Sequence, residues 1–530
     1  MRDVKRLSAC AVTLALPAAL LLLTATACRP DERNAVARTY TIFGGGDSLL
    51  TRRLHKEAQT PVNIVLGRVL PLVRRADIAF LNLEGLLSDR GTCSKFHPAA
   101  APFCFRGRPK LVRLLSEAGI DVVSQANNHT GDFGPSALDD SLQILASQGI
   151  VAVGAGANAE EARRIRYVVR GGVVVAWIAF QEVARRFAAR GNRTGNFFIE
   201  KEKVSETLVP LIRQAREVAD LVVISAHWGN ALEKVPSELR RQHARKMIDA
   251  GADLILGHSA HHFQGAEVYR NGLVLYDTGN FILDFSGDGL VFEIAFDASG
   301  VSRLTAYATR TIRTRIDLLQ NARGDRVLSS FIAQSRALNP NLVYRMERHT
   351  AVFDLEPGRR SPPPRRYVAP KPERVAFDFS RKPACVVSKL PGNLTDRREL
   401  AFGNGVRYLG AVVPATVPQK GPFLLRLYFS SAGGKGTSPW LVSTRLRPRA
   451  EAAKGVPAAT HVPTGWIYPV GEWAAGEIVE DAPLLLTGEL PKGTYDLLFG
   501  LIDETTGTPE VVKGDDGGAA EQLIGSLELI

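Results

Sequence analysis

The alternation of strand-like and helix-like segments between residues 38 and 355 constrains the fold of this chain more than any other feature. Short β-branched runs are followed by amphipathic stretches whose starts carry proline and serine, as at Pro135-Ser136 and Pro236-Ser237. This order is typical of α/β domains in which helices cover the sheets. The strand candidates are residues 40–43, 78–83, 122–124, 173–180, 221–225, 254–256 and 273–276, and the clearest helix candidates are residues 137–147, 206–218 and 238–250.

Polar segments follow five of these strands directly. In an open α/β sheet, binding sites form at the carboxyl ends of the strands. We therefore expect the five segments to converge at one end of one sheet. They are residues 44–47 (GGGD), 82–85 (NLEG), 125–129 (QANNH), 226–229 (AHWG) and 257–262 (GHSAHH).

Five of the ten histidines lie in three of these segments. A single histidine is more often a core or surface residue than a ligand, but five at strand ends favour ligands. With the nearby carboxylates and amides they form a mixed nitrogen and oxygen donor set, which suits divalent ions. Two such ions can bind a phosphoryl group and lower the pKa of a water molecule. The sequence therefore predicts divalent metal ions, two in the favoured interpretation, with Mn, Fe, Zn and Mg left open. The histidines are His129, His227, His258, His261 and His262.

Two other kinds of active site are not indicated. The glycines at residues 44–46 are not followed by the Gly-Lys-Ser/Thr of a P-loop. Ser48, Ser124 and Ser225 lie near histidines in the sequence, but none sits in a Gly-x-Ser-x-Gly elbow. The sequence thus disfavours P-loop nucleotide binding and serine hydrolase chemistry.

A set of short motifs in a fixed order carries a family resemblance. They are Gly46-Asp47, Asn82-Leu83-Glu84, Ala126-Asn127-Asn128-His129 with Asp132 and Gly134, His227-Trp228-Gly229, Gly257-His258 and His261 with Gln264, and Tyr276 with Gly279-Asn280-Phe281. The pattern resembles the poly-γ-glutamate capsule biosynthesis (CapA-type) family and covers roughly residues 40–310. The resemblance implies a calcineurin-like metallophosphatase α/β sandwich.

The resemblance also implies roles for individual side chains. Metal ligands would be Asp47 for the first ion, Glu84 in place of the usual bridging aspartate, Asn128 for the second ion, and His227, His258 and His261 to complete the two sets. His129 would be the general acid, and Asp132 would orient it. His262 is more naturally a packing or substrate residue, and Asn280 more naturally closes the pocket than binds metal.

Two departures from the wider superfamily leave the activity open. The usual Asp-x-His pattern is absent because Asp47 is followed by Ser48 and Leu49, and Ser259-Ala260 separate the last two predicted histidine ligands. The favoured interpretation is a lipid-anchored, metal-dependent phosphoesterase-like protein in the synthesis, export or attachment of a capsule or envelope polymer. The alternative is a non-catalytic protein that binds an anionic polymer through a degenerate metal site.

The N-terminus predicts export. Basic residues precede an apolar stretch that ends near Leu23 and is too short to span a bilayer. Small residues then precede Cys28, which resembles the lipobox of bacterial lipoproteins and implies a signal peptide at residues 1–27 and a lipid on Cys28. Ordinary secretion with an incidental Cys28 thiol is the alternative. We expect a membrane-anchored protein on the periplasmic or cell-surface side.

The charge of the chain limits its partners. The net charge is +12, and removal of residues 1–27, which carry three basic and one acidic side chain, leaves +10. Such an excess suits an anionic envelope polymer or a phosphoester substrate, and capsule-synthesis membrane proteins are further candidate partners. Because the arginines are dispersed and form no single block, we expect no nucleic-acid partner.

The remaining segments predict a second domain and a disulfide. Cys93 and Cys104 bracket a loop and would pair in an oxidising compartment, whereas Cys385 would stay unpaired, buried and inert. Residues 356–374 are rich in proline and arginine and predict an extended linker. Residues 375–530 carry alternating strands, such as 423–429 and 495–502, and predict an antiparallel β-sandwich of open function.

Overall fold

A computed structural model of the protein describes most of residues 39–530. The described range has gaps at residues 94–103, 285, 298, 356–362, 364–366, 368–375, 381, 403–404, 420–421, 432–439, 450–455, 462–463, 465–471, 488–489, 504–505 and 514–519. The predicted signal peptide at residues 1–27 and the predicted lipidation site Cys28 lie outside the described residues. Within the described part of the chain, no helix is both long and apolar enough to cross a membrane.

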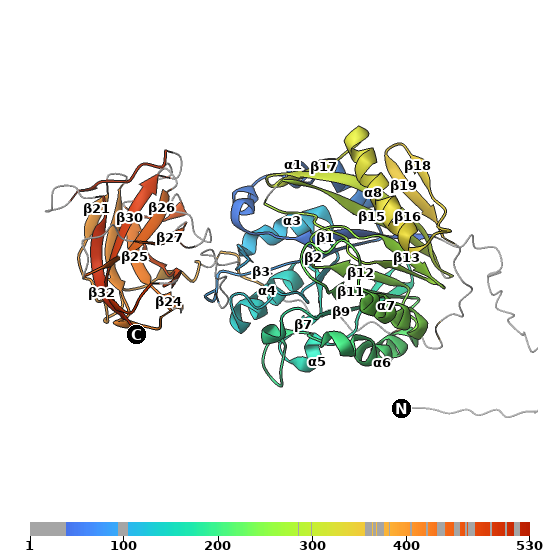
Figure 1. The fold of residues 1–530 in the computed structure, drawn as a ribbon, viewed down its shortest axis with the longest axis horizontal. Helices are drawn as coiled ribbons and strands as arrows, with labels where there is room; N and C mark the ends of the chain where they lie inside the picture. The colour runs from blue at the N-terminus through green and yellow to red at the C-terminus, as the bar shows by residue number, and fades with distance from the viewer. Residues whose placement is uncertain are drawn as a thin grey trace, which may run out of the picture. The chain divides into compact units, whose positions relative to one another are not determined.

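A nine-stranded mixed sheet forms one layer of the N-terminal region (Figure 1). Its strand order is β18-β19-β16-β15-β1-β2-β5-β6, with β17 also paired to β16. Strands β1, β2, β5 and β6 are parallel, whereas β15 and those beyond it are antiparallel. The strands are β1 (Tyr40–Ser48), β2 (Ile78–Leu83), β5 (Val122–Ser124), β6 (Val151–Val153), β15 (Gly287–Asp297), β16 (Gly300–Ile312), β17 (Arg315–Leu318), β18 (Arg345–Glu347) and β19 (Thr350–Asp354).

A six-stranded sheet forms the second layer, in the order β13-β14-β12-β11-β9-β8. Its four central strands are parallel, and both edge strands run antiparallel to their neighbours. The strands are β8 (Arg166–Arg170), β9 (Val173–Gln181), β11 (Leu221–His227), β12 (Leu254–His258), β13 (Ala266–Tyr269) and β14 (Gly272–Leu275). Two two-residue pairings complete the region, formed by β3 (Leu86–Leu87) with β4 (Arg106–Gly107) and by β7 (Ala155–Gly156) with β10 (Gly195–Asn196).

The apolar side chains of the two sheets share one core. Phe80 of β2 stacks on Trp177 of β9 with ring centroids 5.0 Å apart, and both are buried. The opposite faces are covered by helices, with α1–α4 on the nine-stranded sheet and α6 and α7 on the six-stranded one. The helices are α1 (Val62–Leu66), α2 (Leu70–Arg75), α3 (Val112–Ala118), α4 (Pro135–Ser147), α5 (Ala159–Ala162), α6 (Val204–Arg216), α7 (Glu238–Ala250) and α8 (Ala322–Leu338). The predicted α/β class is confirmed.

The expectation that the five polar segments lie on one sheet is wrong. Strands β1, β2 and β5 belong to the nine-stranded sheet, whereas β11 and β12 belong to the six-stranded sheet. The second sheet starts because β8 pairs antiparallel with β9 instead of extending the first sheet beyond β6. The segments nevertheless meet, because side chains at the carboxyl ends of strands in both sheets are in contact.

The C-terminal region contains a six-stranded sheet, β20-β28-β25-β22-β21-β31, and a five-stranded sheet, β23-β32-β30-β26-β27. Buried side chains of both sheets form one apolar cluster, and the thiol of Cys385 packs partly buried against it. The pairings are antiparallel except for β23 with β32. The strands are β20 (Val386–Val387), β21 (Leu400–Phe402), β22 (Val406–Val412), β23 (Thr416–Val417), β24 (Pro422–Leu424), β25 (Arg426–Ser431), β26 (Trp440–Pro448), β27 (Val456–His461), β28 (Ile478–Asp481), β29 (Leu484–Leu486), β30 (Gly493–Asp503), β31 (Val512–Lys513) and β32 (Gln522–Leu529).

One expectation for this region changes in detail. The strand expected at residues 423–429 is interrupted at Leu425, so β24 pairs with β29 while β25 joins the six-stranded sheet. At the interruption, the Leu425 amide donates to the carbonyl of Pro483. Of the predicted linker 356–374 the structure describes only Pro363 and Tyr367, and the Tyr367 ring lies 4.4 Å from that of Tyr167. The predicted domain boundaries stay a prediction.

Candidate metal site

The candidate site lies where the carboxyl ends of two strand pairs meet. In the nine-stranded sheet Asp47 of β1 is paired with Asn82 of β2, and in the six-stranded sheet His227 of β11 is paired with His258 of β12. The two pairs touch across the sheets, because Asn82 Nδ2 lies 3.2 Å from His227 Nδ1 and Asp47 Oδ1 lies 3.6 Å from His258 Nδ1. Side chains that were predicted from separate strands therefore form one cluster.

Asp47 occupies the centre of this cluster and is fully buried. Its position depends on Gly46, because a Cβ atom there would lie 1.9 Å from the carbonyl oxygen of Gly279. That close approach lets the Asp47 amide donate to Gly279 O at 2.8 Å. The Asp47 carboxylate accepts a hydrogen bond of 2.7 Å from Asn82 Nδ2, and its second oxygen lies 3.0 Å from His261 Nδ1.

Glu84 supplies the second buried carboxylate. It follows β2 directly, is fully buried, and lies with Oε2 3.6 Å from His261 Nδ1. Among the residues that the structure describes, Asp47, Glu84 and His261 form the group whose potential ligand atoms all lie within 4.8 Å of one another. Two carboxylate oxygens and one imidazole nitrogen at this spacing can hold a divalent cation.

The segment from His258 to His261 is a strained turn. Ser259 and His261 have φ angles of 104° and 55°, in the left-handed region that non-glycine residues seldom occupy. The Asp277 carboxylate holds the turn, since it accepts hydrogen bonds from the amides of Ala260 at 2.7 Å and Gly279 at 2.8 Å. The two-residue spacer thus brings both His258 and His261 beside Asp47.

The electrostatics of the cluster separate the histidines. Burial lowers the pKa of His227 to about 3 and that of His258 to about 4, in each case against the attraction of Asp47, so both rings are neutral at pH 7. Burial also disfavours the charge of His261, but Glu84 and Asp47 outweigh it and raise its pKa to about 10. Burial opposes ionisation of Asp47 too, yet its hydrogen bond and attraction to His261 keep its pKa below the ordinary value.

The pKa of the Asp277 carboxyl group is shifted in the opposite direction from that of Asp47. Burial and the negative charge of Asp47 raise the pKa of Asp277 to about 8, against the hydrogen bonds from the Ala260 and Gly279 amides. The cluster therefore holds Asp47 ionised, and the proton on His261 provides the positive charge that buried carboxylates require.

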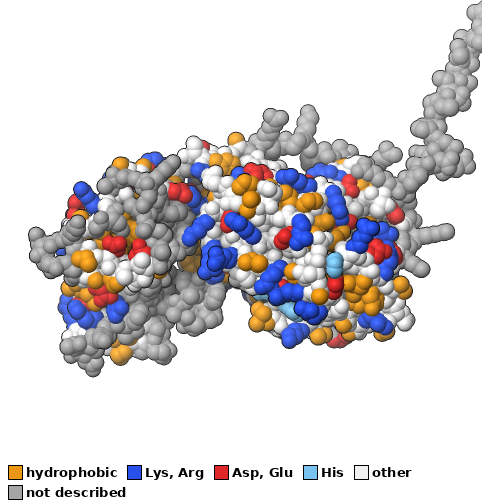
Figure 2. Space-filling model, turned by 90° about the horizontal axis from the view of Figure 1, so that it is seen from above, with side chains coloured by type: hydrophobic (Ala, Val, Ile, Leu, Met, Phe, Trp, Pro, Cys, Tyr) orange, Lys and Arg blue, Asp and Glu red, His pale blue; other side chains and the backbone are white. Residues whose placement is uncertain are grey.

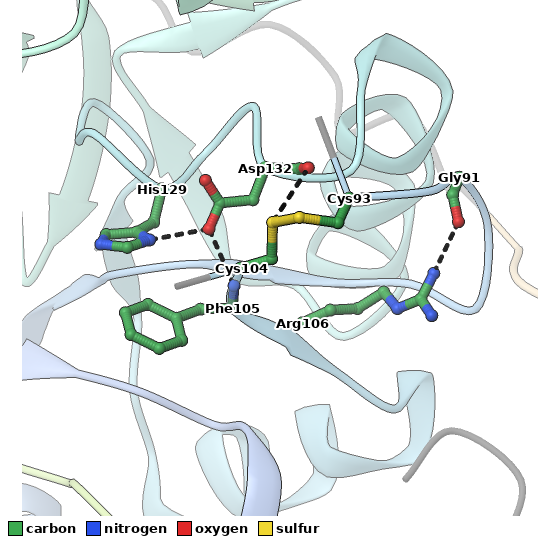
Figure 3. Close-up of a disulfide and its surroundings, with 7 residues drawn as sticks. All are labelled: Gly91, Cys93, Cys104, Phe105, Arg106, His129 and Asp132. Carbon is green, nitrogen blue, oxygen red and sulfur yellow. Dashed lines mark hydrogen bonds and ion pairs between the residues drawn. A yellow bond between two sulfur atoms is a disulfide. The ribbon is translucent and has the colours of Figure 1, made fainter. Parts of the chain in front are cut away.

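His129 approaches the cluster from the loop after β5. Its Nδ1 lies 2.7 Å from Asp132 Oδ2 and its Nε2 lies 3.9 Å from Glu84 Oε1. Figure 3 shows that Phe105 also holds this pair: its amide donates to Asp132 Oδ2 at 2.8 Å. The Phe105 ring lies 4.1 Å from the His129 imidazole, measured between ring centroids. His129 is thus fixed with Nε2 towards the carboxylates.

A disulfide between Cys93 and Cys104 anchors the residue next to Phe105 (Figure 3). The Cα atoms of the two cysteines are 5.9 Å apart, and Cys104 Sγ lies 3.8 Å from the carbonyl oxygen of Asp132. The disulfide therefore lies directly beside the His129–Asp132 pair.

The remaining predicted residues divide between the site and its border. Asn128 lies on the same loop as His129 with its Oδ1 atom buried. Asn280 contacts the cluster at His261, because its Oδ1 lies 3.1 Å from His261 Nδ1 and its Nδ2 donates to the His261 carbonyl. The His262 ring stacks on Phe263, with ring centroids 4.9 Å apart.

Sequence reasoning assigned no role to three residues that position the site. Asn82 bridges Asp47 and His227, and Asn127 donates to Asn82 Oδ1 and to the Leu83 carbonyl. Asp277 holds the histidine turn. A signal was present for Asn82, because a polar amide inside the apolar run of β2 is buried and requires partners.

Comparison with known proteins shows what the N-terminal region is similar to. Residues 41–285 match the family described as bacterial capsule synthesis protein PGA_cap. The chain is 27% identical over 322 residues to the PGA biosynthesis protein CapA of Bacillus subtilis, covering 59% of this chain and 81% of that protein. It is 28% identical over 284 residues to the capsule biosynthesis protein CapA of Bacillus anthracis, covering 52% and 68%.

A third relative extends the match to another group of bacteria. A probable polyglutamine synthesis accessory protein of Mycobacterium tuberculosis is 32% identical over 223 residues, covering 40% of this chain and 57% of that protein. These matches confirm the resemblance that the motifs carried. The N-terminal region of the chain is thus similar to the CapA-type family of bacterial capsule synthesis proteins.

Proposed function

We propose that this protein is a metal-dependent, phosphoesterase-like enzyme that acts in the biosynthesis, export or attachment of a capsule polymer of the poly-γ-glutamate type. The observation that carries the proposal is the convergence of Asp47, Glu84 and His261 with ligand atoms within 4.8 Å of one another. The two facing sheets with helices on both outer sides support a calcineurin-like metallophosphatase sandwich for residues 38–355.

The buried donor set fits a divalent cation. Two fully buried carboxylates face each other across His261, which costs free energy unless a positive charge lies between them. The Nε2 atoms of His227 and His258 are buried and have no hydrogen-bond partner among the described residues. Neutral imidazoles beside carboxyl groups form the mixed donor set of Mn, Fe, Zn and Mg sites, and the identity of the ion stays open.

The residues of the site have different proposed roles. Bound ions would supply Lewis acidity to a phosphoryl oxygen, with Asp47, Glu84, Asn128, His227, His258 and His261 as the proposed ligands. Asp132 orients His129 through Nδ1, so that a proton carried on Nε2 would face the carboxylates. His129 is placed to pass that proton to a leaving group, and Phe105 restrains its ring.

The names of the relatives support the polymer assignment. Proteins of this family from Bacillus are named for capsule and PGA biosynthesis, and the net charge of +12 suits contact with an anionic polymer. We further propose that Cys28 carries a lipid that anchors the protein outside the cytoplasm near capsule-synthesis membrane proteins. The two C-terminal sheets with their shared apolar cluster support a β-sandwich, whose role we leave open.

A non-catalytic binding protein is the second candidate, and one observation favours it. The histidine of the usual Asp-x-His pattern is replaced by Leu49, which is buried against Phe105 and Leu283 and cannot bind metal. Ser48 between them bonds to the Gly46 carbonyl. A site that lacks this one metal ligand could still bind a cation and, through it, an anionic polymer without cleaving the polymer.

Metal content and turnover distinguish these candidates. The purified protein is stripped with a chelator and reconstituted with Mn²⁺, and metal is quantified by mass spectrometry alongside hydrolysis of bis(p-nitrophenyl) phosphate. We expect bound metal and turnover in the wild type, and loss of both in His261→Ala. His349→Ala is the matched control, because His349 is an exposed histidine whose Nδ1 contacts Asp325 instead of the carboxylates of the site. Absence of metal in the wild type contradicts the proposal, and stoichiometric metal without turnover supports the binding protein.

A further inference from the structure

A surface groove begins one residue beyond the candidate metal site. It has a volume of about 470 Å³ and is open to solvent along one side. His262 lines it directly after His261, whose Nδ1 is 3.0 Å from Asp47, so the groove and the metal site share one stretch of chain. The lining residues are His262, Phe263, Asp288, Arg323, Arg326, Val327 and Ser330.

The groove carries positive charge that its own acidic residue does not neutralise. Asp288 is paired with both Arg310 and Arg323, at 2.7 Å in each case, so these three side chains together keep one positive charge. Arg326 is exposed and adds a second. The acidic residue Asp325 is not among the lining residues, and it contacts His349 Nδ1 at 2.8 Å. Figure 2 shows the face on which α8 lies in Figure 1, and basic side chains gather on it.

Lys234 adds to this field from the loop after β11. The carbonyl of the preceding residue, Glu233, accepts a hydrogen bond of 2.9 Å from Gln264 Nε2, two residues beyond His262. Lys234 itself is exposed. Phe263 and Val327 provide apolar surface between the charged groups. Fixed cations beside an apolar surface suit a chain in which carboxylates alternate with methylene groups.

Helix α8 holds the basic wall in place. Asn321 caps its first turn, and Leu328 and Phe331 are buried in the core between the sheets. Ser335 further fixes the helix by accepting a hydrogen bond from the Ala266 amide at 2.9 Å. These contacts hold helix α8 and the basic side chains on it in place. The helix follows residues 41–285, the part of the chain that matches the capsule synthesis family.

We propose that this groove is a carboxylate-binding subsite for an extended polyanion whose neighbouring unit reaches the metal site. Arg326 is the principal contact, because its guanidinium is not engaged by Asp288 and can bind a carboxylate through two parallel hydrogen bonds. Arg323 and Lys234 contribute charge. The inference rests on the proposed function only for the chemistry of the polymer, and it requires no turnover.

The test measures the affinity of the full chain, reconstituted with Mn²⁺, for a fluorescent hexamer of γ-linked glutamate by anisotropy. Arg326→Gln should weaken binding about fivefold, the upper range for one exposed ion pair. Arg336→Gln is the matched control, because it removes the same charge from the exposed surface of the same helix. Arg336 lies ten residues further along, about 15 Å away. It should bind within twofold of the wild type.

Further arms separate the subsite from general charge and from the metal site. Arg326→Lys should recover part of the affinity, and inorganic phosphate at equal charge concentration should compete less well than the hexamer. Equal losses in both glutamine variants, no loss in Arg326→Gln, or equal competition by phosphate would each overturn the subsite. In a His261→Ala background the contrast between residues 326 and 336 should persist. If the protein shows no bound metal and no turnover, and Arg326→Gln still weakens hexamer binding more than Arg336→Gln does, the proposed enzyme activity is refuted and the proposed subsite is supported.

Discussion

The stability of the metal-free protein should fall as the pH rises above about 6.5, and His261 is the main cause. In the unfolded chain this imidazole loses its proton near pH 6.5, whereas in the folded protein Glu84 and Asp47 raise its pKa to about 10. Between these values the folded state binds one proton more than the unfolded state. The free energy of unfolding therefore decreases with pH in this window, because stability rises with pH only where the unfolded state binds more protons.

The expected slope follows from the linkage relation. One group with this difference contributes at most about 1.4 kcal/mol per pH unit. Asp277 acts in the same direction up to about pH 8, because its folded carboxyl keeps a proton that the unfolded chain loses near pH 3.8. The upper bound from pH 7 to 8 is thus about 2–3 kcal/mol. His261 is 30% exposed, so we expect solvent screening to reduce this to about half.

The acid side of the profile has the opposite sign. His227 and His258 stay neutral in the folded protein down to about pH 3 and 4, whereas the unfolded chain binds protons on both below pH 6.5. Stability contributed by these two rings is therefore lost as the pH falls below 6.5. The metal-free protein should be most stable near pH 6.5.

Urea unfolding of chelator-treated protein at pH 6.5, 7.5 and 8.5 measures this profile. His261→Asn is the comparison, because it removes the titrating group while keeping a side chain of similar size. Its slope above pH 6.5 should be shallower by up to about 1.4 kcal/mol per pH unit. Added Mn²⁺ should flatten the wild-type slope, since the cation replaces the proton between the carboxylates. Equal slopes for wild type and variant would refute the electrostatic description of the site.

Three further predictions concern the acid, the disulfide and the anchor. His129→Ala should keep near-normal metal content and lose about 10²–10⁴-fold in turnover, whereas loss of metal would make His129 a ligand. Replacing Cys93 and Cys104 with Ser should lower turnover at unchanged metal content, because Phe105 loses its anchor beside Asp132. Closing this 11-residue separation is worth at most about 3 kcal/mol of stability, and unchanged turnover would reduce the disulfide to a structural role. Cys28→Ala should abolish lipidation and leave the protein soluble or uncleaved, and normal membrane anchoring of that variant would contradict the lipobox.

The parallel strands could be predicted from the sequence because they are buried on both faces. Each expected strand of the N-terminal region lies within an observed one or within one residue of it, and the parallel strands β2, β11 and β12 are buried along their whole length. Helix α7 was equally clear, since Ser237 caps it and Gly251 ends it. These signals are local, and a local signal does not depend on which sheet a strand joins.

The division into two sheets could not be predicted in the same way. Which sheet a strand joins is decided by pairing between distant segments, and the antiparallel half of the nine-stranded sheet comes from residues 287–354. The candidate ligands were found because each follows a strand, but their supports were not. Asp277 acts through the backbone amide of Ala260, on another loop, and that of Gly279, two residues further along the chain, and no sequence spacing predicts the contact with Ala260.

The position of Leu49 leads to a last prediction, on how many ions the site holds tightly. The missing histidine of the Asp-x-His pattern leaves no gap, because Leu49 is buried against Phe105, which in turn contacts His129. The substitution therefore removes a donor beside Asp47 while adding apolar packing behind the proposed acid. The described residues provide a single compact group of carboxylate and imidazole ligands, formed by Asp47, Glu84 and His261. Calorimetric titration of the stripped protein with Mn²⁺ should show one tight ion and a second one bound at least about tenfold more weakly, a difference of about 1.4 kcal/mol. Two ions of equal affinity would show that another group replaces the lost histidine.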